Sequence, residues 1–181
     1  MRRTKYYHYF VEDENEEKIV NVLKTDLQLI IPGKVQKFNV VEQKLTKFRL
    51  MSLKHGTTVV LVFDTDTGKV STLKENINFL KKESAVADVL CVMQVLNLED
   101  EFKRSCNIRQ IKELTNSKSN SDFKCDMLSD SKFYQKLVKH KFDLSKFWNT
   151  NAENEYKLIK NEAEKIKLKK HNIIKESGGT I

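Results

Sequence analysis

Hydrophobic positions follow two alternating patterns through the first hundred residues. Short apolar and β-branched runs, typical of strands, are separated by segments in which apolar residues recur every three or four positions, as they do in helices. This order predicts an α/β fold with a doubly wound, four-stranded, mainly parallel sheet flanked by helices. We expect strands at Tyr6–Val11, Leu27–Ile31, Thr57–Phe63 and Asp88–Leu96, and helices at Glu14–Lys24, Val40–Leu53 and Ser71–Lys82.

The third of these runs, Thr57–Phe63, is continuously β-branched or apolar. A strand without polar alternation is typical of a position that is covered on both faces of a parallel sheet. We therefore expect Thr57–Phe63 to lie in the interior of the sheet.

The pattern changes after Asn97, where strand signals stop. Thr115–Ser121 is rich in Ser and Asn and predicts a loop. We expect an α/β domain over residues 1–102 and a helical extension, packed on or beside it, over residues 103–181. The expected helices are Leu98–Cys106, Ile108–Leu114, Asp122–Leu128, Lys132–His140, Leu144–Trp148 and a longer one at Glu153–Ile174.

Charge divides the chain in the same place. Residues 1–102 contain 15 Lys and Arg against 15 Asp and Glu, whereas residues 103–181 contain 18 against 10, which accounts for the net charge of +8. A basic segment beside concentrated acids favours a polyanionic partner such as DNA or RNA. The same charge also fits lysine-rich helices that are simply solvated.

Two classes of protein are not expected. No apolar run approaches the roughly 20 residues of a membrane span, and Tyr6–Val11 is too short for the core of a signal peptide. Cys91, Cys106 and Cys125 are scattered and odd in number, which argues against a disulfide framework. We expect a cytoplasmic protein with reduced thiols and no membrane partner.

Acidic residues follow the ends of three predicted strands. Glu12 comes after the first strand, Asp64 and Asp66 follow the third, and Glu99 lies shortly after the fourth. Functional crevices of open α/β sheets lie at the carboxyl ends of the strands. We therefore expect these carboxylates to converge.

The acids also suggest a cation. Glu12 and Glu16 are one helical turn apart, and carboxylates this crowded repel unless a hard cation compensates them. An all-oxygen ligand set suits Mg²⁺ or Mn²⁺, whereas the scattered histidines do not suggest a zinc site. In the alternative interpretation, Glu12–Glu17 complements a helix dipole and Asp64 and Asp66 form a turn.

Three acidic segments resemble those of Toprim domains. Tyr9–Glu16 resembles the first Toprim motif, a hydrophobic strand that ends in Glu, and Leu61–Asp66 resembles the second, an Asp-x-Asp after the third strand. Asn97–Phe102 is similar to the acidic segment of overcoming-lysogenization-defect nucleases and related small phage-defence Toprim proteins. The resemblance covers Tyr6–Phe102, and Asp13 stands where the first motif usually has Gly.

This resemblance implies a metal-dependent nuclease that hydrolyses phosphodiester bonds of DNA or RNA. Glu12, Asp64 and Asp66 would be catalytic. Glu12, Glu16 and Asp64 would hold one Mg²⁺ or Mn²⁺ ion, while Asp66 and Glu99 would orient a second ion or its waters. A role in phage defence, with a partner protein of a defence system, would fit the same family.

Contacts to nucleic acid are expected in the basic half. Lys118 and Lys124 lie in or just after the polar loop and are candidate phosphate clamps. Four aromatic residues could stack on bases, but helical spacing favours their packing in a core. They are Phe133, Tyr134, Phe147 and Trp148.

Two other functions remain open. Phe63–Thr67 also resembles the signature of haloacid-dehalogenase phosphatases, in which Asp64 would be the nucleophile and Asp66 the general acid and base. That interpretation leaves Glu12 without a role. In the third possibility the chain is a noncatalytic module that binds nucleic acid or protein.

Overall fold

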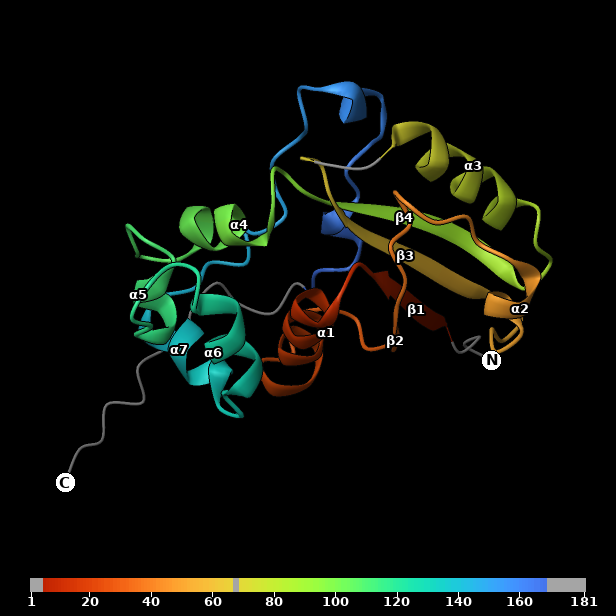
Figure 1. Ribbon diagram of the computed structural model, residues 1–181. Coiled ribbons are helices and arrows are strands. Elements are labelled where there is room, and N and C mark those ends of the chain that lie inside the picture. Colours follow the sequence, from red (N-terminus) through yellow and green to blue (C-terminus); the bar gives the residue numbers. More distant parts are fainter. Residues whose placement is uncertain (1–4, 67–68, 169–181) are drawn as a thin grey trace.

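A computed structural model describes residues 5–66 and 69–168 of the chain (Figure 1). Four strands form one sheet in the order β2-β1-β3-β4, and every neighbouring pair is parallel. The expected α/β class and the four-stranded parallel sheet are confirmed. The strands are β1 (Tyr6–Val11), β2 (Lys34–Lys37), β3 (Thr57–Asp64) and β4 (Val86–Gln94).

Helices cover both faces of this sheet. Figure 1 shows α3 lying along one face, while α4 to α7 gather beyond the carboxyl ends of the strands, next to α1. The N-terminal helix α1 (Glu14–Asn21) continues into a π-helical segment at Val22–Asp26. The other helices are α2 (Lys47–Leu50), α3 (Val70–Lys81), α4 (Leu98–Ser105), α5 (Lys112–Thr115), α6 (Phe123–Ser129), α7 (Phe133–Lys139) and the 3₁₀ turns at Glu155–Leu158 and Ala163–Lys165.

Alternate residues of β3 pack into two different cores. Val60 and Val62 face a core shared with α1 and with α4 to α7. Leu61 and Phe63 face a second core shared with α3 and with the loop after β2. All four side chains are almost completely buried, so the expected interior strand is confirmed.

The second strand does not lie where its apolar run predicted. Leu27–Ile31 forms a loop, and the strand that pairs with β1 is the polar segment Lys34–Lys37. Ile30 is nonetheless fully buried, and the backbone N–H of Ile31 donates to the carbonyl of Ile166 at 2.9 Å. The apolar run Leu27–Ile31 therefore indicated burial beneath the C-terminal segment and not a strand. The polar segment Lys34–Lys37 can form β2 because a strand at the edge of a sheet needs few apolar residues.

The helix expected at Val40–Leu53 is also wrong, because only Lys47–Leu50 is α-helical. The side chain of Asn76 on α3 replaces helical hydrogen bonds here. Its amide donates to the carbonyls of Val40 and Gln43 at 2.8 and 2.7 Å and accepts from the N–H of Leu45 at 2.8 Å. Apolar residues of this segment consequently reach the core from a loop.

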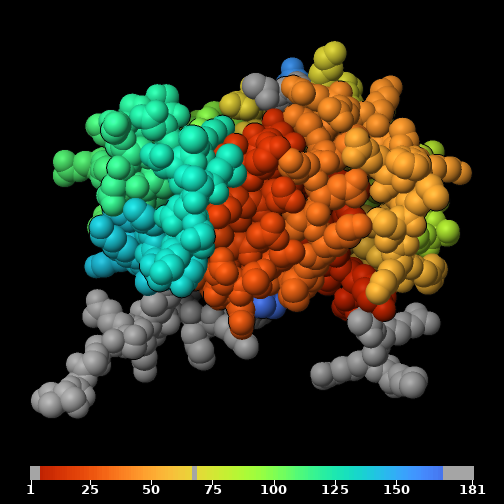
Figure 2. Space-filling model, turned by 60° about the horizontal axis from the view of Figure 1, so that its bottom comes forward, coloured from red at the N-terminus to blue at the C-terminus, as the bar shows by residue number. Residues whose placement is uncertain are grey.

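The C-terminal half contains shorter helices than expected. Helices α4 to α7 confirm four of the predicted segments with shifted ends, but Leu144–Trp148 forms turns. The long helix expected at Glu153–Ile174 is wrong for residues 153–168, which contain two 3₁₀ turns, and residues 169–174 lie outside the described part. In Figure 2 the segment around α6 and α7 lies directly against α1.

The aromatic residues of this half are mostly core residues. Phe133, Phe147 and Trp148 are fully buried, while Tyr134 is partly buried. Packing, rather than base stacking, accounts for the three buried rings. Within residues 5–66 and 69–168, no helix combines the length and apolar character needed to cross a bilayer.

Candidate functional site

The strand order places a switch point between β1 and β3. From β1 the chain crosses to β2 on one side, and from β3 it crosses to β4 on the other. Crevices that bind ligands form at such points, outside the carboxyl ends of the strands. Glu12 directly follows β1 and Asp64 is the last residue of β3, so both predicted catalytic acids lie at this point.

Glu16 is positioned by the start of α1. Asp13 is the N-cap, and its carboxylate accepts from the N–H of Asn15 at 2.6 Å. In return, Oε2 of Glu16 accepts from the N–H of Asp13 at 3.2 Å, which completes a capping box. Asp13 has an extended backbone with φ of −141°, so this position requires no glycine.

Gln94 connects Glu16 to Asp64. It ends β4, lies opposite Asp64 in the register of β3 and β4, and is completely buried. Its Nε2 donates to Oδ1 of Asp64 at 2.5 Å and to Oε1 of Glu16 at 3.3 Å. Two of the predicted metal ligands therefore meet at one amide, which the sequence analysis did not identify.

The electrostatic environment of Glu16 disfavours its charged form. Burial raises the pKa of Glu16 to about 9, with further contributions from a hydrogen bond with the side chain of Asp13 and from the charges of Asp13 and Asp64. Without a compensating cation, this carboxyl is protonated at neutral pH.

The pKa of Asp64 is also raised, and more of the charged residues in the cluster affect it. Burial raises its pKa to about 8, although the hydrogen bond from Gln94 opposes this shift. The charges of Glu12 and Asp66 raise the pKa further, while Lys124 lowers it. Asp64 is thus the acid that interacts with the other members of the cluster on both sides.

Glu12 has an unsatisfied oxygen. Its Oε2 is buried and has no hydrogen-bond partner within the described residues. Burial raises the pKa of Glu12; a hydrogen bond from the backbone of Asp64 opposes this, and the charges of Asp13, Glu42 and Asp66 add to it. An unpaired buried carboxylate oxygen is costly, so a donor or cation at this position would be stabilising.

Tyr156 lies in the electrostatic field of the acids. The ring of Tyr156 contacts Phe63, with 5.8 Å between centroids. Burial raises the pKa of Tyr156, and the charges of Glu155, Glu12 and Asp66 raise it further.

The two predicted basic residues, Lys118 and Lys124, lie in different environments. Lys124 on α6 lies 3.3 Å from the carboxylate of Glu99. Burial lowers the pKa of Lys124, but the charges of Glu99, Glu16 and Asp13 outweigh it and the net shift is upward. Glu99 therefore joins the cluster through Lys124, whereas Lys118 is exposed on the loop between α5 and α6.

Three residues of the site were missed by the sequence analysis. Gln94 had a signal, because it is the polar residue that interrupts the apolar run of β4. Glu42 and Tyr156 had none, because a loop and a 3₁₀ turn bring them to the sheet. Their positions depend on tertiary packing.

The donor chemistry fits a hard divalent cation. The side chains are carboxylates, and one buried oxygen of Glu12 is free. Across the described residues, however, no three acidic, histidine or cysteine side chains are already grouped as a metal cage.

Comparison with known proteins leaves the family open. No family model matches the chain, and neither a curated protein nor a solved structure matches it. One fold can carry many functions, so the evidence for function lies in the side chains of this site.

Proposed function

We propose that the chain is a Mg²⁺-dependent nuclease that hydrolyses phosphodiester bonds at the acid cluster. The principal support is that Glu12 follows β1 and Asp64 ends β3 at the switch point, and that the amide of Gln94 links Asp64 to Glu16. All three carboxyls have raised pKa values because they are buried beside like charges. Perturbed carboxyls in a crevice are typical of functional sites.

Asp64 would be the central ligand of the cation. Glu12, directly after β1, and Glu16, which Gln94 links to Asp64, would complete the coordination together with waters. When bound, the cation polarises the scissile phosphate and stabilises charge on the leaving oxygen. Asp66 is exposed and adds negative charge beside Glu12 and Asp64.

Glu12 is a further candidate ligand of the cation. Its Oε2 is buried and lacks a donor among the described residues, so a cation would compensate this oxygen. Lys124 lies beside the cluster, and its ammonium group would contact a phosphate oxygen of the substrate. In the free protein Glu99 pairs with Lys124, and phosphate would compete for that contact.

The substrate is assigned as nucleic acid because of the distribution of charge. All of the net charge of +8 derives from residues 103–181, which include Lys124. Such an excess of positive charge attracts a polyanion over long distances and favours its backbone over small phosphate esters.

Cleavage of labelled DNA and RNA tests the proposal. We expect cleavage of one or both with Mg²⁺ or Mn²⁺ and none with excess EDTA. Cleavage that persists in EDTA would contradict a cation-dependent mechanism. Turnover of a small phosphate ester without cleavage of either polymer would instead favour the Asp64-nucleophile phosphatase.

A further inference from the structure

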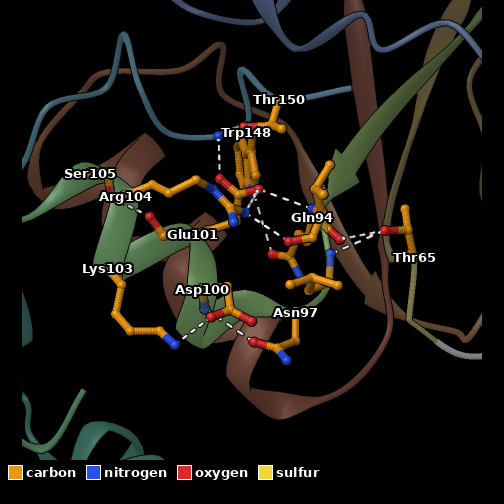
Figure 3. Close-up of polar contacts among 12 residues, drawn as sticks. Thr65, Gln94, Asn97, Asp100, Glu101, Lys103, Arg104, Ser105, Trp148 and Thr150 are labelled. Carbon is orange, nitrogen blue, oxygen red and sulfur yellow. Dashed lines mark hydrogen bonds and ion pairs between the residues drawn. The ribbon is translucent and has the colours of Figure 1, made fainter. Parts of the chain in front are cut away.

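The buried amide of Gln94 has a defined orientation. Nε1–H of Trp148 donates to Oε1 of Gln94 at 3.3 Å (Figure 3). Indole nitrogen only donates, so it selects the oxygen of the amide and turns the NH₂ group toward the carboxylates. That NH₂ group then contacts both Asp64 and Glu16.

The position of Trp148 is itself strongly constrained. Its backbone N–H donates to Oε2 of buried Glu101 at 2.8 Å, and its carbonyl accepts from Asn161 at 3.0 Å. Trp148 adopts a left-handed backbone with φ of 56°, which is unfavourable for a bulky residue. Surrounding contacts must therefore hold it in place.

Glu101 extends the network to the exit of β4. Its Oε1 accepts from Arg104 at 2.6 Å, as Figure 3 shows. The same oxygen accepts from the N–H of Val95 at 3.0 Å. Arg104 also donates to the carbonyl of Val95 at 2.7 Å. The turn after Gln94 and the turn at Trp148 are thus fixed to the same carboxylate.

We propose that Gln94 is a positioning residue of the cation site and that Trp148, in the C-terminal half, holds its amide in the productive orientation. The inference rests on the cation site of the proposed function. Gln94 holds the carboxylates of Glu16 and Asp64, which come from different elements, beside each other, while the N–H of Asp13 fixes the other oxygen of Glu16. Residues after Phe102 are then part of the site as well as a surface for nucleic acid.

An amide suits this role better than a carboxylate. A glutamate at position 94 would accept from Trp148 but would repel Glu16 and Asp64 instead of donating to them. Partners that orient metal ligands typically change metal affinity by about 10- to 100-fold when they are removed. Trp148 is the single tryptophan of the chain, so its fluorescence reports directly on this contact.

Binding of Mn²⁺, measured by electron paramagnetic resonance of the free ion, tests the inference without requiring activity. Gln94→Met preserves length but removes the amide, and we expect it to weaken Mn²⁺ binding by about 10- to 100-fold. Gln110→Met, at an exposed position, is the matched control and should bind as the wild type does. Melting in EDTA establishes that each variant is folded.

Fluorescence adds a readout that a purely structural role would not affect. In the wild type, Trp148 emission should change saturably with the same midpoint as Mn²⁺ binding. In Gln94→Met, this response should disappear even where Mn²⁺ still binds at high concentration. If Gln94→Met does not fold, Trp148→Phe leaves Gln94 in place, frees its amide, and should also weaken Mn²⁺ binding.

The possible failures are distinguishable. A wild type that binds no Mn²⁺ or Mg²⁺ would overturn the proposed function together with this inference. A wild type that binds Mn²⁺, beside a folded Gln94→Met or Trp148→Phe variant of equal affinity, would overturn the positioning role alone. Wild-type binding without any change in Trp148 emission would likewise contradict the coupling.

Discussion

Asp64 and Gln94 face each other at the carboxyl ends of β3 and β4, and the amide of Gln94 donates to the carboxylate of Asp64 at 2.5 Å. Burial raises the pKa of half-buried Asp64 to about 8, which favours its protonated form at neutral pH in the metal-free protein. A cation would displace this proton. The protonation of Asp64 therefore affects both the stability of the metal-free protein and the proposed binding of Mg²⁺.

The metal-free protein should lose stability as pH rises. The folded pKa of Glu16, about 9, lies above its ordinary value of 4.5, so stabilisation is complete below about pH 4.5 and disappears as pH rises through 9. The loss is on the order of a few kcal/mol, since a tenfold change in proton affinity corresponds to about 1.4 kcal/mol. Urea unfolding in EDTA at several pH values measures it.

Glu16→Gln supplies the comparison for this pH dependence. The variant removes the titrating group. Its free energy of unfolding should therefore change less than that of the wild type between about pH 5 and about pH 9. Glu17→Gln, on the same helix, should retain the wild-type slope. Equal slopes for the wild type and Glu16→Gln would contradict the assigned environment of Glu16.

Nucleic-acid binding should weaken steeply as salt concentration rises, because phosphate contacts release counterions. Lys124→Ala should weaken binding and reduce the slope of log K against log salt by about 1. Lys74→Ala, on the exposed surface of α3, is the matched control. A salt-independent affinity would indicate that the basic half binds a protein partner.

Asn76→Leu should destabilise the fold by about 3 kcal/mol. It leaves the N–H of Leu45 and the carbonyls of Val40 and Gln43 without their side-chain partner, and unsatisfied buried groups cost about 1–3 kcal/mol each. Because the same loop carries Glu42, the environment of Glu12 should also change. Chemical denaturation of Asn76→Leu and of exposed Lys74→Ala measures the difference.

The strands with strong apolar runs were predictable, whereas the loop-borne core was not. β1 and β3 consist largely of aromatic, apolar and β-branched residues, and this composition favours a strand that is covered on both faces. Leu27–Ile31 and the segment around Val41 carry the same apolar signal, yet Ile166 and Asn76 satisfy their backbone groups outside any sheet or helix. Such long-range hydrogen bonds cannot be inferred from local periodicity.

The residues of the candidate site also fall into two groups, those that the local sequence indicates and those that only the tertiary structure brings together. Glu12 and Asp64 were identified because parallel strands bring their carboxyl ends together. Gln94 and Trp148 meet through a hydrogen bond between residues 54 positions apart, and no spacing rule connects them. Local sequence therefore indicated the acids, while the residues that orient them required the tertiary structure.

Glu12→Gln separates the two proposed enzymes. The nuclease needs Glu12 at the cation, so this variant should lose cleavage by at least about 100-fold while it still binds nucleic acid. A phosphatase with an Asp64 nucleophile would not need Glu12. Full activity of Glu12→Gln, together with an inactive Asp64→Asn variant, would therefore favour the phosphatase.

Single-turnover cleavage of labelled nucleic acid by Asp64→Asn, beside the wild type, tests the central proposal most directly. Asn resembles the protonated Asp64, so the metal-free fold should be unchanged or slightly stabilised, and Mg²⁺ should raise the melting temperature of the wild type only. Asp88→Asn, at the other end of β4, is the matched control and should cleave normally. We predict Mg²⁺-dependent cleavage by the wild type and Asp88→Asn and none by Asp64→Asn; undiminished cleavage by folded Asp64→Asn would contradict the proposed site.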